Sequence, residues 1–463
     1  MSNAPRVPSA PPWAAAAMLG LGLAAVSGPA TAARPLHTLL ALIAAALVAA
    51  IVVHPPVAAY VLLATTPLTA GLERGEFIPL LRPSEAIALV VIGGLALRAL
   101  IASKGRFSPR VDRMDLAILF LTVSGSIVPL LWMLARAKDV TQDDLLYALQ
   151  LWKYYAVFLA VRTAVRTEQQ VRVCLWLAML AGSLVGAIAI IEAGNLFGVP
   201  DLLSEYYGVE GSDKRGSSTL GSTHALADLM VMNLAIAGGW LIRGGPRRGL
   251  VLLLAFGFVF GVIASGQISG YLGLLLAVGT VGLITGTLGR SFLVFVPVAA
   301  IAALSLRSVV AARLSGFESE TGIPQSWEAR LENLRTFFWP ELSHNFNWVM
   351  GVRPSPRVPA PETWRDWVWI ESGHTYLLWT GGVLFCVAFV VFLWTGMRRV
   401  ARIARDRTDA VGVAAIASLT GLVLVAVLMA LDPHLTFRGA ADLNFSLLAL
   451  ALAGSNVSRR APG

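Results

Sequence analysis

The sequence predicts an all-α integral membrane protein: a polytopic helical bundle of 12–14 spans with one extracytoplasmic loop domain. The first observation is composition, since 56% of the 463 residues are hydrophobic and only 14% are charged, whereas a soluble protein carries roughly 25% charged residues. The second is a mean hydropathy of +0.71. The third is the recurrence of apolar runs long enough to cross the hydrocarbon core as helices.

These apolar runs follow one another with short polar connections. The first run, with the small residues Ala30-Thr31-Ala32 after it, resembles a signal peptide, but an uncleaved first helix is the preferred interpretation. The second and third runs are poorly separated by His54-Pro55-Pro56, and one tight hairpin is the interpretation that leaves the span count at 12 to 14. The expected spans are 13–29, 36–53, 55–71, 84–102, 115–134, 143–163, 171–192, 221–242, 249–264, 267–286, 291–309, 374–396, 410–431 and 441–456.

Basic residues are concentrated in alternate loops, which orients the bundle by the positive-inside rule with both termini in the cytoplasm. The net charge of +9 therefore reflects the basic residues that set the membrane topology, and it does not indicate a nucleic-acid partner. The expected partner is the lipid bilayer. The inside loops hold Lys104, Arg106, Arg110, Arg113, Arg162, Arg166, Arg172, Arg243, Arg247, Arg248, Arg290, Arg398, Arg399, Arg402, Arg405, Arg407, Arg459 and Arg460, against Arg34, Arg74, Arg82, Arg136 and Lys138 in the outside loops.

Two connections, 193–220 and 310–373, are long, and both are expected outside the membrane on the extracytoplasmic side. A structureless loop as long as the second would be unusual, so we expect a small domain there. The chain is therefore divided into an N-terminal transmembrane bundle (1–309), an extracytoplasmic loop domain (310–373) and C-terminal transmembrane helices (374–463). Within the loop domain, Ser326 is the expected N-cap of an amphipathic helix.

Tryptophan is concentrated in this region, because seven of the thirteen lie between Trp327 and Trp379. An interfacial aromatic belt is one interpretation. The other is a set of flat apolar faces for sugar rings or a lipid chain. Trp364, Trp367 and Trp369 alternate with charged residues in a loop, which favours possible glycan or lipid contacts for these three.

Two cationic or titratable residues stand at the outer ends of spans. Arg215 lies among small residues just before a span, where its planar guanidinium could bind phosphate oxygens or simply be solvated. His374 opens a later span. Histidine is suited to removing a proton from a hydroxyl, although an interfacial histidine more often only forms hydrogen bonds.

Other polar residues fall inside or at the start of spans. His224 and Asp228 are four apart on one helix face and could form half a metal site, but pairing with each other is the preferred interpretation. Thr141 and Asp144 form an expected capping box, with metal binding as the alternative. Lys153 must face a partner or a cavity. The two cysteines lie in apolar runs, and without a phosphate-binding loop or zinc motif no metal or other cofactor is expected.

The run from Arg215 to Ala227 resembles a motif of the O-antigen ligase and O-antigen polymerase family, membrane glycosyltransferases of the GT-C type. Arg215, Thr219 and Ala227 match that motif. The departures are Ser218 for a glycine, Thr223 for a proline and His224 for an asparagine.

Two later segments are also similar to that family, in the same order. Trp327 to Leu331, which includes Arg330, and then Trp348 to Val352 resemble its loop helix and Gly-x-Gly approach. His374 to Gly382 resembles the segment that begins a late span. The departures are Arg353 for a glycine, Thr375 for an asparagine and Ile268 for an arginine that holds diphosphate in the family. The resemblance covers roughly residues 60–400.

The resemblance implies a glycosyltransferase that moves a glycan from an undecaprenyl-diphosphate carrier to the hydroxyl of a glycan or lipid-linked acceptor. The reaction would occur at the outer face of a bacterial inner (cytoplasmic) membrane, with the active site facing the periplasm or cell exterior. Arg215 and Arg330 would bind the diphosphate, and His374 would be the catalytic base. Ligase and polymerase remain alternatives within this interpretation. A polytopic transporter or flippase of lipid-linked sugars, or a non-catalytic scaffold, remains open outside it.

Overall fold

The structure is a computed structural model that describes residues 35–75, 80–102, 111–207, 215–315, 325–363 and 365–454. Ten helical segments in these ranges are long and apolar enough to cross a membrane, which makes the chain a multi-pass helical membrane protein. They are α2 (Pro35–Val53), α4 (Pro83–Ala102), α5 (Arg113–Ser124) with α6 (Ile127–Ala135), α8 (Glu168–Ala193), α10 (Thr223–Ile242), α11 (Arg248–Ser265), α12 (Ile268–Thr285), α13 (Leu288–Ser305), α18 (Gly373–Asp406) and α19 (Ala410–Leu428).

Three further expected spans correspond to helices that do not meet that criterion. Two of these, α3 (Pro56–Thr69) and α20 (Ala440–Gly454), are apolar but short. The third, α7 (Gln142–Ala164), carries charged residues along its length. The expected first span at 13–29 lies outside the described residues. α2 ends at Val53 and α3 begins at Pro56, so the second and third expected spans are separate helices.

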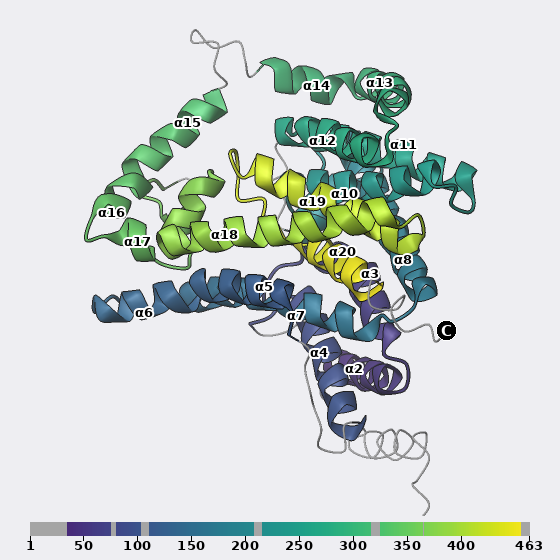
Figure 1. The fold of residues 1–463 in the computed structure, drawn as a ribbon. Coiled ribbons are helices and arrows are strands. Elements are labelled where there is room, and N and C mark those ends of the chain that lie inside the picture. The colour runs from purple at the N-terminus through teal and green to yellow at the C-terminus, as the bar shows by residue number, and fades with distance from the viewer. Residues whose placement is uncertain are drawn as a thin grey trace, which may run out of the picture.

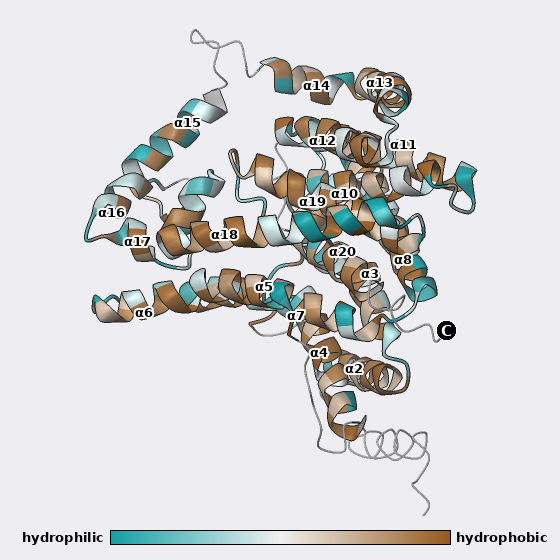
Figure 2. Cartoon of the chain, viewed as in Figure 1, coloured by the Kyte–Doolittle hydropathy of each residue, from teal (hydrophilic) through white to brown (hydrophobic). Residues whose placement is uncertain are grey.

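The bundle has a dry centre and a lipid-compatible surface. Of the most apolar 18-residue stretch of each helix, 83% is buried in α19 and 78% in α10, whereas only 6% is buried in α13 and 11% in α2. α20 is also almost wholly buried, between α7 and α19. The peripheral helices α2 and α13 are nevertheless largely apolar (Figure 2), and many of their large apolar side chains are exposed. Such a surface requires a hydrocarbon environment, and helices satisfy every backbone group within it.

Two adjacent glycines let the connection between α15 (Gln325–Asn333) and α18 pack on the bundle. Gly382 has φ +65° inside α18, and a Cβ there would lie 2.1 Å from the Val349 carbonyl oxygen. A Cβ on Gly381 would lie 2.3 Å from the Ser124 carbonyl oxygen. Only glycine permits both approaches. The short helix α17 (Asn347–Met350) is thereby held against α18.

The segment expected as a loop domain caps one end of the bundle, next to the start of α18 (Figure 1). Its buried Leu334, Phe338 and Val368 belong to the same hydrophobic core as the spanning helices. α15 begins at Gln325, so Ser326 lies in its first turn rather than at the cap. The elements are α14 (Arg307–Leu314), α15 (Gln325–Asn333), the π-turn η3 (Leu334–Phe338), α16 (Trp339–Ser343), α17, and a hairpin of β1 (Arg357–Pro359) and β2 (Trp367–Trp369).

Candidate functional site

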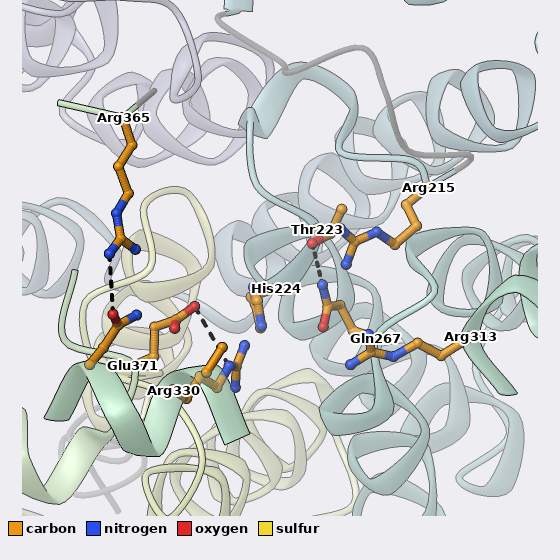
Figure 3. A pocket seen from close by; sticks show the side chains of 10 residues that line it. Arg215, Thr223, His224, Gln267, Arg313, Arg330, Arg365 and Glu371 are labelled. Carbon is orange, nitrogen blue, oxygen red and sulfur yellow. Dashed lines mark hydrogen bonds and ion pairs between the residues drawn. The ribbon is translucent and has the colours of Figure 1, made fainter. Parts of the chain in front are cut away.

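A cavity of about 410 Å³ lies at this capped end, between α15 and the ends of the spanning helices. Figure 3 shows the side chains of Arg215, Arg313 and Arg330, from three separate segments, around His224. Four arginines and one carboxylate line the cavity, so it is strongly cationic. The lining residues are Arg215, Thr223, His224, Gln267, Arg313, Ala329, Arg330, Asn333, Arg365 and Glu371.

The loop that carries Arg215 is anchored on the end of α8. The Glu192 carboxylate accepts hydrogen bonds from the backbone N–H groups of Ser217 (2.8 Å) and Ser218 (2.6 Å). A Cβ on Gly216 would lie 2.6 Å from the Ala189 carbonyl oxygen. The small residues around Arg215 therefore serve the packing of the loop on α8. They give the arginine a fixed base from which to enter the cavity.

The turn between α11 and α12 makes room for the Arg215 side chain. Gly266 has φ +61°, and a Cβ there would lie 2.9 Å from Cγ of Arg215. The next residue, Gln267, lines the cavity and donates a hydrogen bond to the Thr223 hydroxyl. Ile268, which stands where the resembled family has an arginine, begins α12 here.

Arg313 is a site residue that the sequence interpretation missed. It lies near the end of α14 and lines the main cavity as well as a smaller hollow shared with Ile268 and Arg330. Among the described residues it has no hydrogen-bond or ion-pair partner, and its Nε is buried without one. An arginine supplied by α14 therefore stands close to the position where Ile268 replaces the family's arginine. The available signal was a pair of arginines at the end of the expected span 291–309, Arg307 inside it and Arg313 just beyond it.

An aspartate in the connection between α19 and α20 joins two cavity residues. Asp432 Oδ2 accepts a hydrogen bond from Nη1 of Arg330 at 3.1 Å and lies 3.3 Å from Nε2 of His224. Burial would raise the pKa of Asp432, but the hydrogen bond with His224 and the nearby charge of Arg330 hold it well below its ordinary value. A carboxylate that stays charged can orient the imidazole and stabilise its protonated form.

The expected pairing of His224 with Asp228 is wrong, because each residue binds the 429–439 connection instead. Asp228 Oδ2 lies 2.7 Å from Nδ1 of His434, and both side chains are almost completely buried. Residues four apart share a helix face, and that face of α10 is covered by this connection. The Phe437 ring lies beside both imidazoles. In the part of the chain that the structure describes, no group of three or more His, Cys, Asp or Glu residues could hold a metal ion.

The structure does not bring His374 to this cavity. His374 lies in the first turn of α18 with an exposed side chain, and it is not among the described residues that line the cavity. The adjacent Thr375 is the side chain that turns inward, accepting a hydrogen bond from Nε1 of Trp339 at 3.3 Å. The expectation that His374 and Arg215 contact one ligand has no support in this arrangement, whereas Arg215 and Arg330 line one cavity.

Two of the tryptophans expected to contact a glycan or lipid, Trp367 and Trp369, are not among the residues that line this cavity. Trp367 and Trp369 are on β2, with 37% and 44% of their surfaces exposed. Trp364 lies outside the described residues. Between the two exposed indoles, the guanidinium carbon of Arg357 sits 4.1 Å from the Trp367 ring and 5.2 Å from the Trp369 ring.

The structure also tests the expected capping box of α7 and the expected partner of Lys153. The capping box of Thr141 and Asp144 is confirmed at the start of α7. Asp144 also pairs with Arg353 at 2.6 Å, so the residue that departs from the family's glycine has a structural partner. Lys153 pairs with Asp442 on α20 at 2.8 Å, which confirms that it faces a partner inside the bundle.

The electrostatics of the cavity favour an anionic ligand. Burial and the charges of Arg313 and Arg330 lower the pKa of Arg215. Burial and the Arg330 charge likewise lower the pKa of Arg313. For Glu371, burial raises the pKa despite Arg330, whose Nε lies 3.6 Å away. Cations that destabilise one another in a partly dry site are stabilised when a bound anion supplies the opposite charge.

Neither a protein-family model nor a curated protein matches this chain. Functional inference therefore depends on the cavity itself.

Proposed function

We propose that this protein is a membrane-embedded glycosyltransferase. It would move a glycan from an undecaprenyl-diphosphate carrier to an acceptor hydroxyl at the outer face of the bacterial inner membrane. The observation that carries the proposal is the cavity in which Arg215, Arg313 and Arg330 surround a histidine at one end of a spanning bundle. The diphosphate of a lipid-linked donor is anionic and lies at a membrane surface, so its charge and its position both match this cavity.

The arginines would bind the diphosphate and stabilise it as it leaves. Arg313 has no partner of its own among the described residues, and Arg330 is already oriented by Asp432. Guanidinium groups match phosphate oxygens in a bidentate manner. As the bond between the sugar C1 and the phosphate oxygen breaks, that oxygen keeps the electron pair and gains negative charge. Donors fixed before the reaction stabilise this charge without having to reorganise.

His224 replaces His374 as the base in this proposal. When Nε2–H of His224 donates to Asp432, the lone pair is on Nδ1 and can accept a proton. The acceptor hydroxyl would lose its proton to this imidazole while its oxygen forms the new bond to C1. The Asp432 carboxylate, 3.3 Å from Nε2, would stabilise the resulting imidazolium.

The expected topology puts this cavity on the side where such a donor would be delivered. The cavity lies near the start of α18, while the arginine-rich segment 398–407 is at the far end of that 34-residue helix. After the break at Gly382, the rest of α18 spans roughly 36 Å at about 1.5 Å per residue, enough to cross the hydrocarbon core of about 30 Å. Under the positive-inside rule the arginine-rich end is cytoplasmic, so the cavity faces outward.

The test is a transfer assay with the purified chain and lipid-linked glycan extracted from the host membrane. Release of undecaprenyl diphosphate and formation of a longer or newly attached glycan are measured for wild type, Arg215→Gln, Arg313→Gln and His224→Gln. Each variant should lose about 10²-fold or more in turnover, as for a removed oxyanion donor. Arg335→Gln, which changes an exposed arginine on η3, is the matched control.

Two results would contradict the proposal. One is wild-type turnover in all three cavity variants. The other is a wild-type protein that consumes no lipid-linked glycan but moves it between the leaflets of a vesicle, which would favour the flippase.

A further inference from the structure

A second group of arginines lies apart from the cavity, where α3, α4 and the 429–439 connection meet. It consists of Arg74, Arg82 and Arg438, which we call the second arginine cluster. One carboxylate, Glu85, serves two of them: Nη2 of Arg74 is 2.6 Å from Oε1, and Nη1 of Arg82 is 3.8 Å from the same oxygen. The Nε atoms of Arg74 and Arg82 are buried without a hydrogen-bond partner among the described residues.

Arg438 completes the cluster and has no hydrogen bond or ion pair with the residues that the structure describes. Its charge acts on Arg82, as does that of Arg74. Burial and these two charges lower the pKa of Arg82 to about 9, and Glu85 offsets this only in part. The backbone next to Arg438 is fixed, since a Cβ on Gly439 would lie 2.5 Å from Leu220 Cδ2. Arg438 therefore extends from a closely packed part of the chain.

An aromatic surface borders this cluster. Tyr147 on α7 is within electrostatic reach of Arg82 and Arg438, and its ring packs edge-on against Trp369 at 6.3 Å. On the hairpin, Arg357 stands opposite Trp369 and is neutralised by two 2.7 Å contacts with Asp143. This ion pair fixes the two exposed indoles on either side of it. Exposed, rigid aromatic faces beside unneutralised cations suit a ligand that has both apolar ring faces and an anionic group.

We infer that the second arginine cluster binds the phosphate group of a phosphate-bearing acceptor, whose sugar rings lie against Trp367 and Trp369. Phosphate binding stands by itself, whereas the word acceptor rests on the glycosyltransferase proposed above. The 429–439 connection joins the two sites: Asp432 contacts His224 at the cavity, and Arg438 belongs to the second cluster.

The experiment is native mass spectrometry of the full chain in detergent, with phosphatidic acid as a lipid phosphate and diacylglycerol as its uncharged counterpart. Wild type should bind two phosphatidic acid molecules and no diacylglycerol. The Arg82→Gln/Arg438→Gln variant should lose one molecule, with at least ten-fold weaker binding at that site. The Arg215→Gln/Arg313→Gln variant should lose the other, and Arg335→Gln neither. Displacement by inorganic phosphate distinguishes a free phosphate group from a lipid headgroup as the source.

Outcomes separate this inference from the proposed function. Unchanged stoichiometry and affinity in Arg82→Gln/Arg438→Gln would overturn the second site while leaving the cavity intact. The second site would also be overturned if phosphatidic acid binding were lost only in the Arg215→Gln/Arg313→Gln variant. The Arg82→Lys/Arg438→Lys variant keeps both positive charges. It should therefore retain most of the phosphatidic acid binding that the Arg82→Gln/Arg438→Gln variant loses. If the lysine variant binds as poorly as the glutamine variant while both remain monodisperse, the charge argument is wrong.

Discussion

The Nε2 atom of His224 lies 3.3 Å from a carboxylate oxygen of Asp432, although α10 carries the first and the connection after α19 carries the second. The same carboxylate accepts a hydrogen bond from Arg330 at 3.1 Å. One aspartate therefore connects the histidine of the cavity to an arginine of α15. This relationship joins the cap to the centre of the bundle and gives His224 an orienting group.

Asp432→Asn is expected to lower turnover by about 10- to 100-fold, because the carboxamide cannot stabilise an imidazolium and cannot pair with Arg330. The effect should be larger on kcat than on KM, and the pH profile of kcat should shift. Both are measured in the transfer assay. Asp201→Asn, at an exposed aspartate of α9 (Val199–Tyr207), is the control. An unaltered pH profile in Asp432→Asn would count against an orienting role.

Glu371 is expected to make anion binding depend on pH. Its folded-state pKa is raised above the ordinary 4.5, chiefly by burial. As the pH falls through that raised value the carboxyl becomes neutral, so the cavity becomes more cationic and binds a diphosphate more tightly. Glu371→Gln should bind inorganic diphosphate more tightly than wild type at neutral pH and show a smaller gain in affinity as the pH falls. Isothermal titration between pH 5 and 8 measures both, and equal slopes in the two proteins would contradict the assignment.

The class of the protein and part of the site could be predicted from the sequence, because both depend on local patterns. Apolar length marks the spans, and the order of Arg215 and Arg330 in similar motifs predicted a shared ligand-binding region. The partners of His224 could not be predicted, since Asp432 lies in a connection distant in sequence. The sequence favours His374 as the base because it opens a span in a segment that resembles the family's motif, but the orientation of a first-turn side chain depends on packing. Arg313 carries no such signal, because the expected span 291–309 ends inside α14 and leaves Arg313 in a loop.

Gly266→Ala is expected to impair donor binding without touching the reacting atoms. At φ +61° an alanine is strained, and its Cβ would lie 2.9 Å from Cγ of Arg215. The arginine stem must shift, so KM for the lipid-linked donor should rise several-fold with a smaller change in kcat. Gly249→Ala, where a Cβ would meet nothing within 4 Å, is the matched control. Equal KM values for the two variants would show that Arg215 does not need this fixed position.

The ion pair between Lys153 and Asp442 offers a test of the bundle rather than of the cavity. Nζ of Lys153 lies 2.8 Å from the carboxylate, and the two side chains are 15% and 5% exposed. Removing one partner leaves a buried charge unpaired, which costs about 3–5 kcal/mol in a dry interior. Lys153→Met should therefore lower the thermal midpoint in detergent, measured by intrinsic fluorescence, clearly more than Lys138→Met at the exposed turn after α6. Lys153→Met combined with Asp442→Asn removes both charges, keeps an acceptor for the Gly439 N–H, and should recover most of the loss. If the double variant is as unstable as the single one, the lost stability comes from packing and not from an unpaired carboxylate, and the pair has no special electrostatic role in α7 and α20.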